Sequence, residues 1–392
     1  MDEYGIQTAF SGKKVLIIAG EASGDMHGGT LARELLKQDS SLRLYGVGSK
    51  HMKEAGVHML ADAAELSVVG ALEVLTHIRA IYRVFNTLKR FLKQERPDLL
   101  VLIDFPEFNI LLGKAAKKIG VPILYYISPQ VWAWRRGRIK TIASLVKTIV
   151  VVLPFEVDLY KPSGVDVRFV GHPLTDTVQS SYTQQEARKQ FGLDIQKRTV
   201  AILPGSRTKE ITHILPVLLE TAGLLKTRFP ELQFIMPVAH TLSKDFIGTF
   251  MDAAPVQVKL VEGQVYDVLR ASDAAMVTSG TATLETGLMA VPMVIVYRFS
   301  TLSYIIGRML VYVKQIGLIN IVAGEQVAPE LVQHKATPKN IADAMTAILE
   351  DPEQHQRMRN QLIGIRKRLG DGGTSARVAS VVLDVLKGNN HA

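Results

Sequence analysis

Short, almost continuously apolar runs alternate along this chain with longer segments in which apolar residues recur every three or four positions. This pattern predicts strands that are buried on both faces of a parallel sheet, and helices that cover them. The predicted strands of the first half are KKVLIIAGE, LRLYGVG, PDLLVLIDF, VPILYYIS, TIVVVLPF and VRFVG. Those of the second half are RTVAILPGSR, LQFIMPVA, VQVKLVEG, AAMVTSG and VPMVIVYR.

The pattern restarts after a polar, turn-rich stretch around residues 176–183. We therefore expect an α/β protein with two doubly wound, Rossmann-like domains that face a central cleft, residues 1–178 and 179–392. The second domain would carry the closing C-terminal helices, one of which has Thr337 as predicted N-cap and Pro338 at its first position. Ligands of such sheets bind beyond the carboxyl ends of the strands, so the turns there are the places to search for chemistry.

The amino-acid composition restricts the kinds of partner that the protein can bind. The chain has 392 residues, no cysteine and a formal net charge of +9. The missing cysteine excludes disulfides and thiolate metal sites, and it fits a reducing compartment. A basic balance suits an anionic partner. No nucleic acid is expected, because no known binding signature and no long basic stripe interleaved with aromatic residues occurs.

We expect a cytoplasmic protein. The first residues, MDEYGIQTAF, begin acidic and lack the apolar stretch of a signal peptide. The most apolar long segment, residues 293–322, is interrupted by Arg298, Arg308 and Lys314. The pieces between these charges are too short to span a bilayer, so we interpret the segment as a buried strand followed by an amphipathic helix.

Two turns of the first half could carry chemistry. AGEASGDMHGG follows the first strand, and its small residues at a helix start suit an anion or a polar sugar; the candidates are Glu21, Ser23, Gly24 and Asp25. It does not match G-x-G-x-x-G, and a tight turn capped by Asp25 is the alternative. LIDFPEFN ends an apolar strand at Asp104, where a partly desolvated carboxylate can act as a general base. A helix cap or an ion-pair partner is the alternative there.

A third stretch, SPQVWAWRRGRIK, places tryptophans next to arginines. Trp132 and Arg135 would suit sugar stacking or phosphate binding. Tryptophans packed in the core beside a solvated basic face would give the same pattern, so both interpretations stay open.

Two turns of the second half suit a nucleotide. In LPGSRTKEI, backbone donors, Ser206 and Arg207 could hold a diphosphate, although the turn is not a Walker A loop. In SGTATLETG, residues 279–281 supply donors at a helix start, and Glu285 lies one turn further on the same face. A carboxylate would repel phosphate but suits a neutral diol such as ribose. The alternative is a capping box, whose usual spacing Thr281 and Glu285 do not meet.

Taken in order and spacing, GEASGD, IDFPEFN, SPQVWAWR, VGHPL, LPGSR and TSGTATLE resemble the lipid-A-disaccharide synthases, from about Lys14 to the C-terminal helices. The resemblance implies a GT-B fold and a metal-independent, inverting glycosyl transfer without a cofactor. The implied donor is UDP-2,3-diacylglucosamine and the implied acceptor is 2,3-diacylglucosamine 1-phosphate (lipid X). The products would be the β-1,6-linked lipid A disaccharide 1-phosphate and UDP, a step of lipopolysaccharide biosynthesis in Gram-negative bacteria. The resemblance also implies a peripheral protein that works at the cytoplasmic face of the inner membrane. It further implies a homodimer through the C-terminal region.

The resemblance assigns roles to residues of this chain. Asp104 is the favoured general base. The donor site is expected to contain Ser206, Arg207, Gln264, Ser279, Gly280, Thr281, Glu285 and Asn320. The acceptor side or cleft is expected to contain Glu21, Ser23, Gly24, Asp25, Trp132 and Arg135. The family commonly has Leu-Pro-Asn where this chain has Leu318-Ile319-Asn320, which leaves the conformation of that loop open.

Acylated substrates require access to a bilayer, and residues 66–94 are the candidate segment. Its apolar residues could meet acyl chains and its basic residues anionic headgroups. The apolar candidates are Val68, Val69, Leu72 and Leu75. A core helix with a solvated basic face is the alternative.

Proteins with two other functions would show parts of the same sequence pattern. A UDP-sugar 2-epimerase of the same fold would release no disaccharide. A non-catalytic UDP-sugar-binding or membrane-scaffold protein would bind ligand without turnover. The WAWRR stretch and the apolar segment argue against a soluble epimerase.

Overall fold

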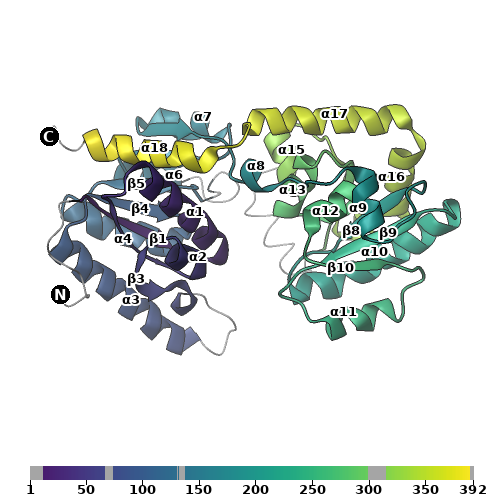
Figure 1. The fold of residues 1–392 in the computed structure, drawn as a ribbon, viewed down its shortest axis with the longest axis horizontal. Coiled ribbons are helices and arrows are strands. Elements are labelled where there is room, and N and C mark those ends of the chain that lie inside the picture. Colours follow the sequence, from purple (N-terminus) through teal and green to yellow (C-terminus); the bar gives the residue numbers. More distant parts are fainter. Residues whose placement is uncertain (1–11, 67–73, 130, 132–136, 299–314, 389–392) are drawn as a thin grey trace. The chain divides into compact units, whose positions relative to one another are not determined.

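The computed structural model describes residues 12–66, 74–129, 131, 137–298 and 315–388. Contacts divide the chain into two compact units, Met1–Pro173 with Gly372–Ala392, and Leu174–Asp371 (Figure 1). The sequence-based division, 1–178 and 179–392, differs from this one at residues 174–178 and at residues 372–392, which it assigns to the other domain.

The described strands of the first unit form one parallel sheet in the order β3-β2-β1-β4-β5-β6-β7. They are β1 Lys14–Ala19, β2 Arg43–Gly48, β3 His58–Asp62, β4 Leu99–Ile103, β5 Ile123–Tyr126, β6 Thr148–Val151 and β7 Asp166–Phe169. The helices are α1 Ala22–Gln38, α2 Lys50–Glu54, α3 Val74–Glu95, α4 Pro106–Lys118, α6 Arg138–Leu145, α7 Glu156–Tyr160 and α18 Thr374–Lys387, with 3-10 turns η1 Ala63–Glu65 and η2 Lys161–Ser163. Every residue of β4, LLVLI, is buried, as a strand covered on both faces requires.

Helix α18 joins the first unit because its apolar face packs against α1 (Figure 1). Val378, Val382 and Val385 on this face are buried. At its start, the Arg377 Nε donates a hydrogen bond to the Val170 carbonyl oxygen at 2.7 Å. Packing between residues so far apart in the chain leaves no local trace in the sequence, which explains why the predicted boundary missed it.

The second unit repeats the architecture with the sheet order β10-β9-β8-β11-β12-β13, again parallel. Its described strands are β8 Thr199–Leu203, β9 Gln233–Val238, β10 Lys259–Glu262, β11 Ala274–Thr278, β12 Met293–Tyr297 and β13 Glu330–Val332. Its described helices are α8 Leu174–Thr177, α9 Gln184–Gln190, α10 Thr208–Arg228, α11 Lys244–Met251, α12 Val265–Ala271, α13 Thr281–Leu288, α15 Leu318–Ala323, α16 Pro338–Glu350 and α17 Pro352–Leu369, with η3 Gln333–Lys335. The N-cap at Thr337 is confirmed, since its side chain accepts a hydrogen bond from the Asn340 amide.

In each sheet the strand order reverses between two neighbouring strands, β1 and β4 in the first unit and β8 and β11 in the second. Such a reversal opens a crevice beyond the carboxyl ends of the two strands, because their connections leave in opposite directions. The turns after these four strands are four of the five that the sequence marked for chemistry; the fifth, SPQVWAWRRGRIK, follows β5.

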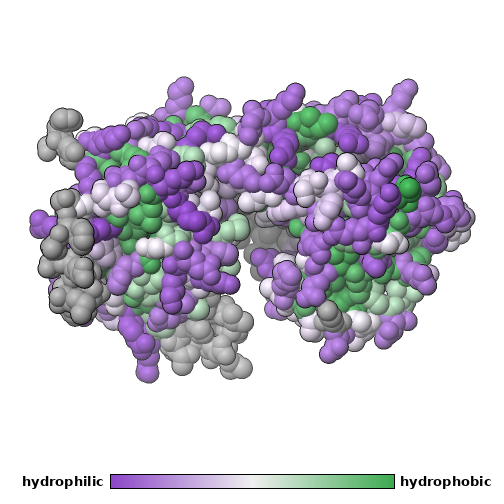
Figure 2. Space-filling view, viewed as in Figure 1, coloured by the Kyte–Doolittle hydropathy of each residue, from purple (hydrophilic) through white to green (hydrophobic). Residues whose placement is uncertain are grey.

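In the described part of the chain, no helix is long and apolar enough to cross a membrane. Hydrophilic side chains dominate the faces seen in Figure 2. The strand predicted at the start of residues 293–322 is β12. Residues 299–314 lie outside the described residues, so the helix predicted after that strand stays a prediction.

Candidate active site

Asp104 stands at the reversal point of the first sheet, directly after β4. Its neighbour strand β1 ends in register with β4, Ala19 opposite Ile103, so Glu21 and Asp104 leave the sheet at the same edge. Asp104 is half-buried. Burial first, and then the charges of Glu21 and Glu107, raise the pKa of its carboxyl from 3.8 to about 6, although a bond from the Phe105 amide opposes them. A carboxylate of this kind is a better base near neutral pH than an ordinary aspartate.

The other residues of the first turn differ in their surroundings. Asp25 is buried, and its carboxylate accepts hydrogen bonds from the amides of Ser49 (2.6 Å), His51 (2.9 Å) and Met52 (3.2 Å). It therefore stabilises the start of α2, a contact distant in sequence, rather than capping its own helix. Glu21 and Ser23 are exposed, and Gly24 is buried.

Two histidines of the first unit lie close enough to affect each other, and sequence reasoning did not single them out. His27 lies in α1 with its ring 6.4 Å from that of Tyr126, and His172 follows β7. The pKa of both imidazoles is lowered to about 4, by burial in His27 and by burial together with the nearby His27 in His172. Both rings are therefore neutral near pH 7, which suits hydrogen bonds to sugar hydroxyls more than pairing with phosphate.

The tryptophan and arginine candidates, Trp132 and Arg135, lie outside the described residues. Further along that segment, Arg138 of α6 forms an ion pair with Glu107 at 2.8 Å. Glu107 is exposed and engaged by this pair, which leaves Asp104 as the stronger candidate for a base.

In the second unit, the turn after β8 is organised by Glu210. This carboxylate accepts a hydrogen bond from the Ser206 amide at 3.2 Å and pairs with the Arg207 guanidinium at 2.8 Å. Gly205 has a φ of 110°, and a Cβ at this position would collide with Glu210. The hydroxyl of Thr241 donates to the Ser206 carbonyl oxygen at 2.9 Å, so the turn is held from both sides. Arg207 itself is exposed and available to an anion.

The turn after β11 leads into α13. Gly280 is the N-cap of this helix with a φ of 139°, and Thr281 is exposed at the first helical position. The hydroxyl of Ser279 donates to the Ile316 carbonyl oxygen at 2.8 Å. Ser279 thus ties this turn to the loop before α15, while the amides at the start of α13 provide the positive end of a helix dipole.

Glu285 is half-buried on α13, and the Tyr266 hydroxyl of α12 donates to its carboxylate at 2.9 Å. Burial raises the pKa of Glu285, although the bond from Tyr266 opposes this shift. The bond fixes the carboxylate on the second turn of the helix, where the sequence predicted it.

Asn320 uses its amide to hold the loop between α15 and β13. Its Nδ2 donates to the Ala328 carbonyl oxygen and to the Glu330 carboxylate, both at 2.8 Å. Its Oδ1 accepts from the amides of Val327 and Ala328, both at 2.9 Å. The side chain is fully buried, so a direct bond to a nucleotide would require one of these four bonds to break.

Gln264 is exposed and precedes α12 with a φ of 47°. Its Oε1 accepts a hydrogen bond from the side-chain Nε2 of Gln190 at 3.0 Å. The described residues contain no group of three or more side chains that could hold a metal ion.

Sequence reasoning also passed over Glu210, Tyr266, Asn109 and Tyr125. Glu210 carried a usable signal, because a Glu at the third position of a predicted helix often reaches back to the preceding turn. The two tyrosines carried none, because both stand inside ordinary helix and strand patterns.

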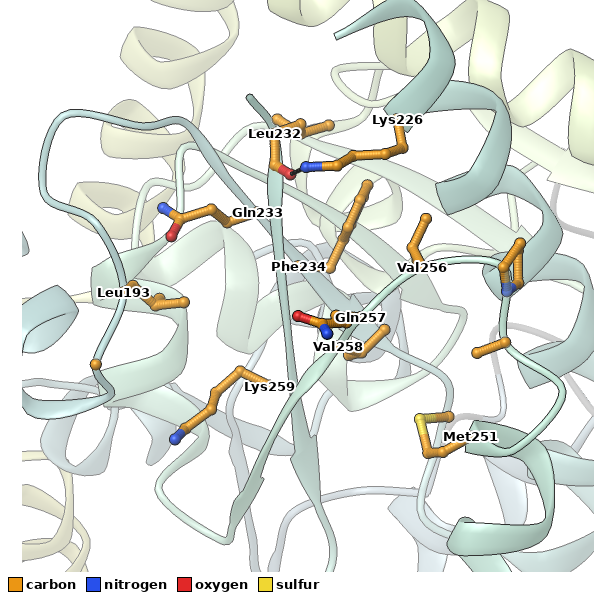
Figure 3. Close-up of a pocket in the computed structure, with 13 residues that line it drawn as sticks. Leu193, Lys226, Leu232, Gln233, Phe234, Met251, Val256, Gln257, Val258 and Lys259 are labelled. Carbon is orange, nitrogen blue, oxygen red and sulfur yellow. Dashed lines mark hydrogen bonds between the residues drawn. The ribbon is translucent and has the colours of Figure 1, made fainter. Parts of the chain in front are cut away.

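A cavity of ≈ 740 Å³ in the second unit lies away from these turns (Figure 3). It is lined by residues at the amino ends of β9 and β10, including Gln233, Phe234 and Lys259. Lys226 extends to its rim, and its amine donates to the Leu232 carbonyl oxygen at 2.8 Å. Ligands of parallel sheets bind at the opposite ends of the strands, so the size of this cavity does not make it the site.

Comparisons with solved structures show the fold. The chain is similar to the UDP-GlcNAc 2-epimerase from Neisseria meningitidis bound to UDP-GlcNAc, with a TM-score of 0.64 and 14% identity, covering 95% of this chain and 100% of that one. It is also similar to CalG4, the calicheamicin glycosyltransferase, with a TM-score of 0.61 and 16% identity, covering 96% and 99%. The expected GT-B fold is thus confirmed, and the epimerase is a neighbour in fold alone.

Comparisons with sequences are more specific. A family model described as lipid-A-disaccharide synthetase matches residues 15–380. The lipid-A-disaccharide synthase of Geobacter metallireducens is 50% identical over 374 residues, covering 95% of this chain and 97% of that one. That of Coxiella burnetii is 43% identical over 376 residues, covering 96% and 99%. The chain belongs to the lipid-A-disaccharide synthase family.

Proposed function

We propose that this glycosyltransferase makes the lipid A disaccharide from UDP-2,3-diacylglucosamine and 2,3-diacylglucosamine 1-phosphate (lipid X). The observation that carries the proposal is Asp104, a half-buried carboxylate with a raised pKa at the reversal point of the first sheet, in a member of this family. The transfer would be inverting and would yield the β-1,6-linked disaccharide 1-phosphate and UDP.

In this mechanism Asp104 accepts the proton of the acceptor 6-hydroxyl while that oxygen attacks the donor's anomeric carbon. The new carbon–oxygen bond forms as the bond to the β-phosphate oxygen breaks, and UDP leaves with the electron pair from the opposite face. A base whose pKa lies near the working pH exists largely as carboxylate and still has enough basicity to take the proton.

The second unit would hold the leaving group. Arg207 and the amides at the start of α13 would stabilise the charge that develops on the diphosphate, with no metal or other cofactor taking part. Glu285 would accept hydrogen bonds from the ribose hydroxyls with the carboxylate that Tyr266 orients. Asn320 would shape the neighbouring loop without touching the nucleotide.

The test is incubation with UDP-diacylglucosamine and lipid X, followed by mass analysis for the disaccharide. Asp104→Asn should form no product and still bind UDP as the unmodified protein does. Turnover of that variant at the unmodified rate would contradict the base assignment. Conversion of the UDP-sugar without any disaccharide would favour the epimerase instead.

We also propose peripheral association with the cytoplasmic face of the inner membrane through the start of α3. One face of α3 is core, since Leu88 and Phe91 are fully buried. Another face exposes Ile78 (55%) and Tyr82 (66%), one turn apart, beside the exposed Arg79. Exposed apolar side chains next to cations are typical of a helix that lies at the membrane–water interface.

The membrane candidates from the sequence precede Ile78 along the chain. Val68, Val69 and Leu72 lie outside the described residues, and Leu75 lies in α3 without a described side chain. The double substitution Ile78→Ser, Tyr82→Ser should lower binding to anionic phospholipid vesicles by about tenfold or more. The exposed Leu224 of α10 offers a control, and Leu224→Ser should leave vesicle binding unchanged. Equal loss with both variants, or loss only through unfolding, would contradict this surface.

A homodimer through the C-terminal region is a further part of the proposal. In a single chain α18 packs on its own first unit, so an exchange of C-terminal segments would place the same face against a second copy. Sedimentation of the full chain and of a chain ending before α18 would test it, with a dimer expected only for the full chain.

A further inference from the structure

The turn that carries Asp104 adopts an unusual backbone conformation. Asp104 and Phe105 are consecutive non-glycine residues with φ values of 45° and 46°. Residues with a Cβ rarely adopt this left-handed region, and they remain there only where surrounding contacts enforce it. Surrounding contacts must therefore hold this turn, which presents a reactive side chain, in its strained conformation.

Two buried side chains hold the main chain of this turn. The Tyr125 hydroxyl donates a hydrogen bond to the Asp104 carbonyl oxygen at 2.6 Å. The Asn109 Nδ2 donates to the same oxygen at 2.7 Å and to the Ile103 carbonyl oxygen at 3.2 Å. Both side chains have 0% exposure, so the two donors are shielded from water. Burial also raises the pKa of Tyr125 well above 10, so its hydroxyl stays a donor at every working pH.

The opposite side of the turn is blocked by packing. A Cβ on Gly20 would overlap the Phe105 ring, so this ring lies directly against the backbone that follows β1. The Phe105 ring also packs on Phe108 of α4, with centroids 5.7 Å apart. Packing of the Phe105 ring therefore supports the conformation of the turn in addition to the two hydrogen-bonding side chains.

We propose that Tyr125 and Asn109 are positioning residues of the reaction, which fix the Asp104 carboxylate through its own carbonyl oxygen. The inference rests on the proposed function of Asp104 as base. It predicts that loss of the Tyr125 hydroxyl moves the carboxylate and slows the chemical step, while the UDP site in the other unit keeps its affinity.

Tyr125→Phe removes one hydroxyl without changing the shape of the side chain. It should lower kcat by about 10- to 100-fold, since small displacements of a reacting group have effects of this size. UDP affinity and the KM for the donor should change little. The acid limb of the pH–rate profile should move to lower pH, because a carboxylate released toward water loses part of the burial that raises its pKa.

Tyr160→Phe is the matched control. Tyr160 is another fully buried tyrosine of the same unit, and its hydroxyl bonds to Ser128 instead of to Asp104. Tyr160→Phe should destabilise the protein by a similar amount and leave kcat within about twofold. A second variant, Asn109→Ser, should reproduce the kcat loss of Tyr125→Phe.

Two results separate the inference from the function on which it rests. If Asp104→Asn is inactive while Tyr125→Phe and Asn109→Ser keep the kcat of the Tyr160→Phe control, the positioning role is wrong and the base assignment stands. If Asp104→Asn remains fully active, the base assignment fails first.

Discussion

The hydroxyl of Tyr266 donates a hydrogen bond to the carboxylate of Glu285 at 2.9 Å and so connects α12 to the second turn of α13. Tyr266 engages one carboxylate oxygen, and a ribose diol would use the remaining acceptor capacity. An acceptor fixed in this way loses little conformational freedom when it binds a sugar.

We predict that Glu285→Ala weakens UDP binding by about tenfold or more, as expected for hydrogen bonds to a charged group. The informative comparison is between UDP and 2′-deoxy-UDP in calorimetric titrations. The unmodified protein should prefer UDP, and Glu285→Ala should lose that preference. A variant that still discriminates between the two nucleotides would show that Glu285 does not contact the ribose.

A second prediction concerns pH. Because the pKa of Asp104 is raised to about 6 in the folded protein, its charged form is unfavourable there relative to the unfolded chain. The cost is fully present above pH about 6 and disappears as the pH falls toward the unfolded value of 3.8. Activity should rise with pH over the same range, on an acid limb near pH 6, because the base must be ionised, while the contribution of Asp104 to stability falls.

Asp104→Asn separates the two effects. It should abolish transfer and raise the free energy of unfolding near neutral pH by on the order of 2 kcal/mol, an amount that shrinks below pH about 6. Urea denaturation at several pH values measures this change. A variant that is destabilised at neutral pH would mean that the charged carboxylate has stabilising partners in the fold.

Local patterns predicted the strands, and they placed the candidate turns at the carboxyl edge of each sheet. The run LLVLI had to be a strand buried on both faces, and in a doubly wound sheet the residue after it, Asp104, had to stand at the ligand-binding edge. What no pattern could supply were partners distant in the sequence. Asp25 was expected on the acceptor side, with a cap of its own helix as the alternative, and its carboxylate accepts hydrogen bonds from the start of α2. Tyr125 and Tyr266 were not singled out, because a sequence does not show where a hydroxyl points.

Asn320 illustrates the same limit, and it gives the third prediction. Family resemblance placed it at the nucleotide, whereas all four of its hydrogen bonds serve the loop before β13. Asn320→Ala should therefore destabilise the protein by about 3 kcal/mol, because it leaves buried donors and acceptors unpaired. Asn340→Ala is the control: the Asn340 Nδ2 donates to the Lys335 carbonyl oxygen at the surface, and the loss of this bond should cost little. Weaker UDP binding without any loss of stability would instead favour a direct contact.

The last prediction concerns Glu210 and Arg207. A carboxylate near a diphosphate is unfavourable by charge alone, yet Glu210 holds both the Ser206 amide and the Arg207 guanidinium. If its main effect is to orient Arg207, Glu210→Ala should weaken UDP binding, by about three- to tenfold. Repulsion as the main effect would make the same variant bind UDP more tightly.

A double-mutant cycle decides between these effects. Arg207→Ala should weaken UDP binding by about tenfold and leave uridine binding unchanged, because only the diphosphate needs the guanidinium. When Arg207 is already absent, Glu210→Ala should have little further effect, since the group that it orients is gone. A coupling free energy of roughly 1 kcal/mol between the two positions is expected from calorimetric titrations of the four proteins. Additive effects would mean that Glu210 acts on the Gly205–Ser206 turn alone, through the Ser206 amide.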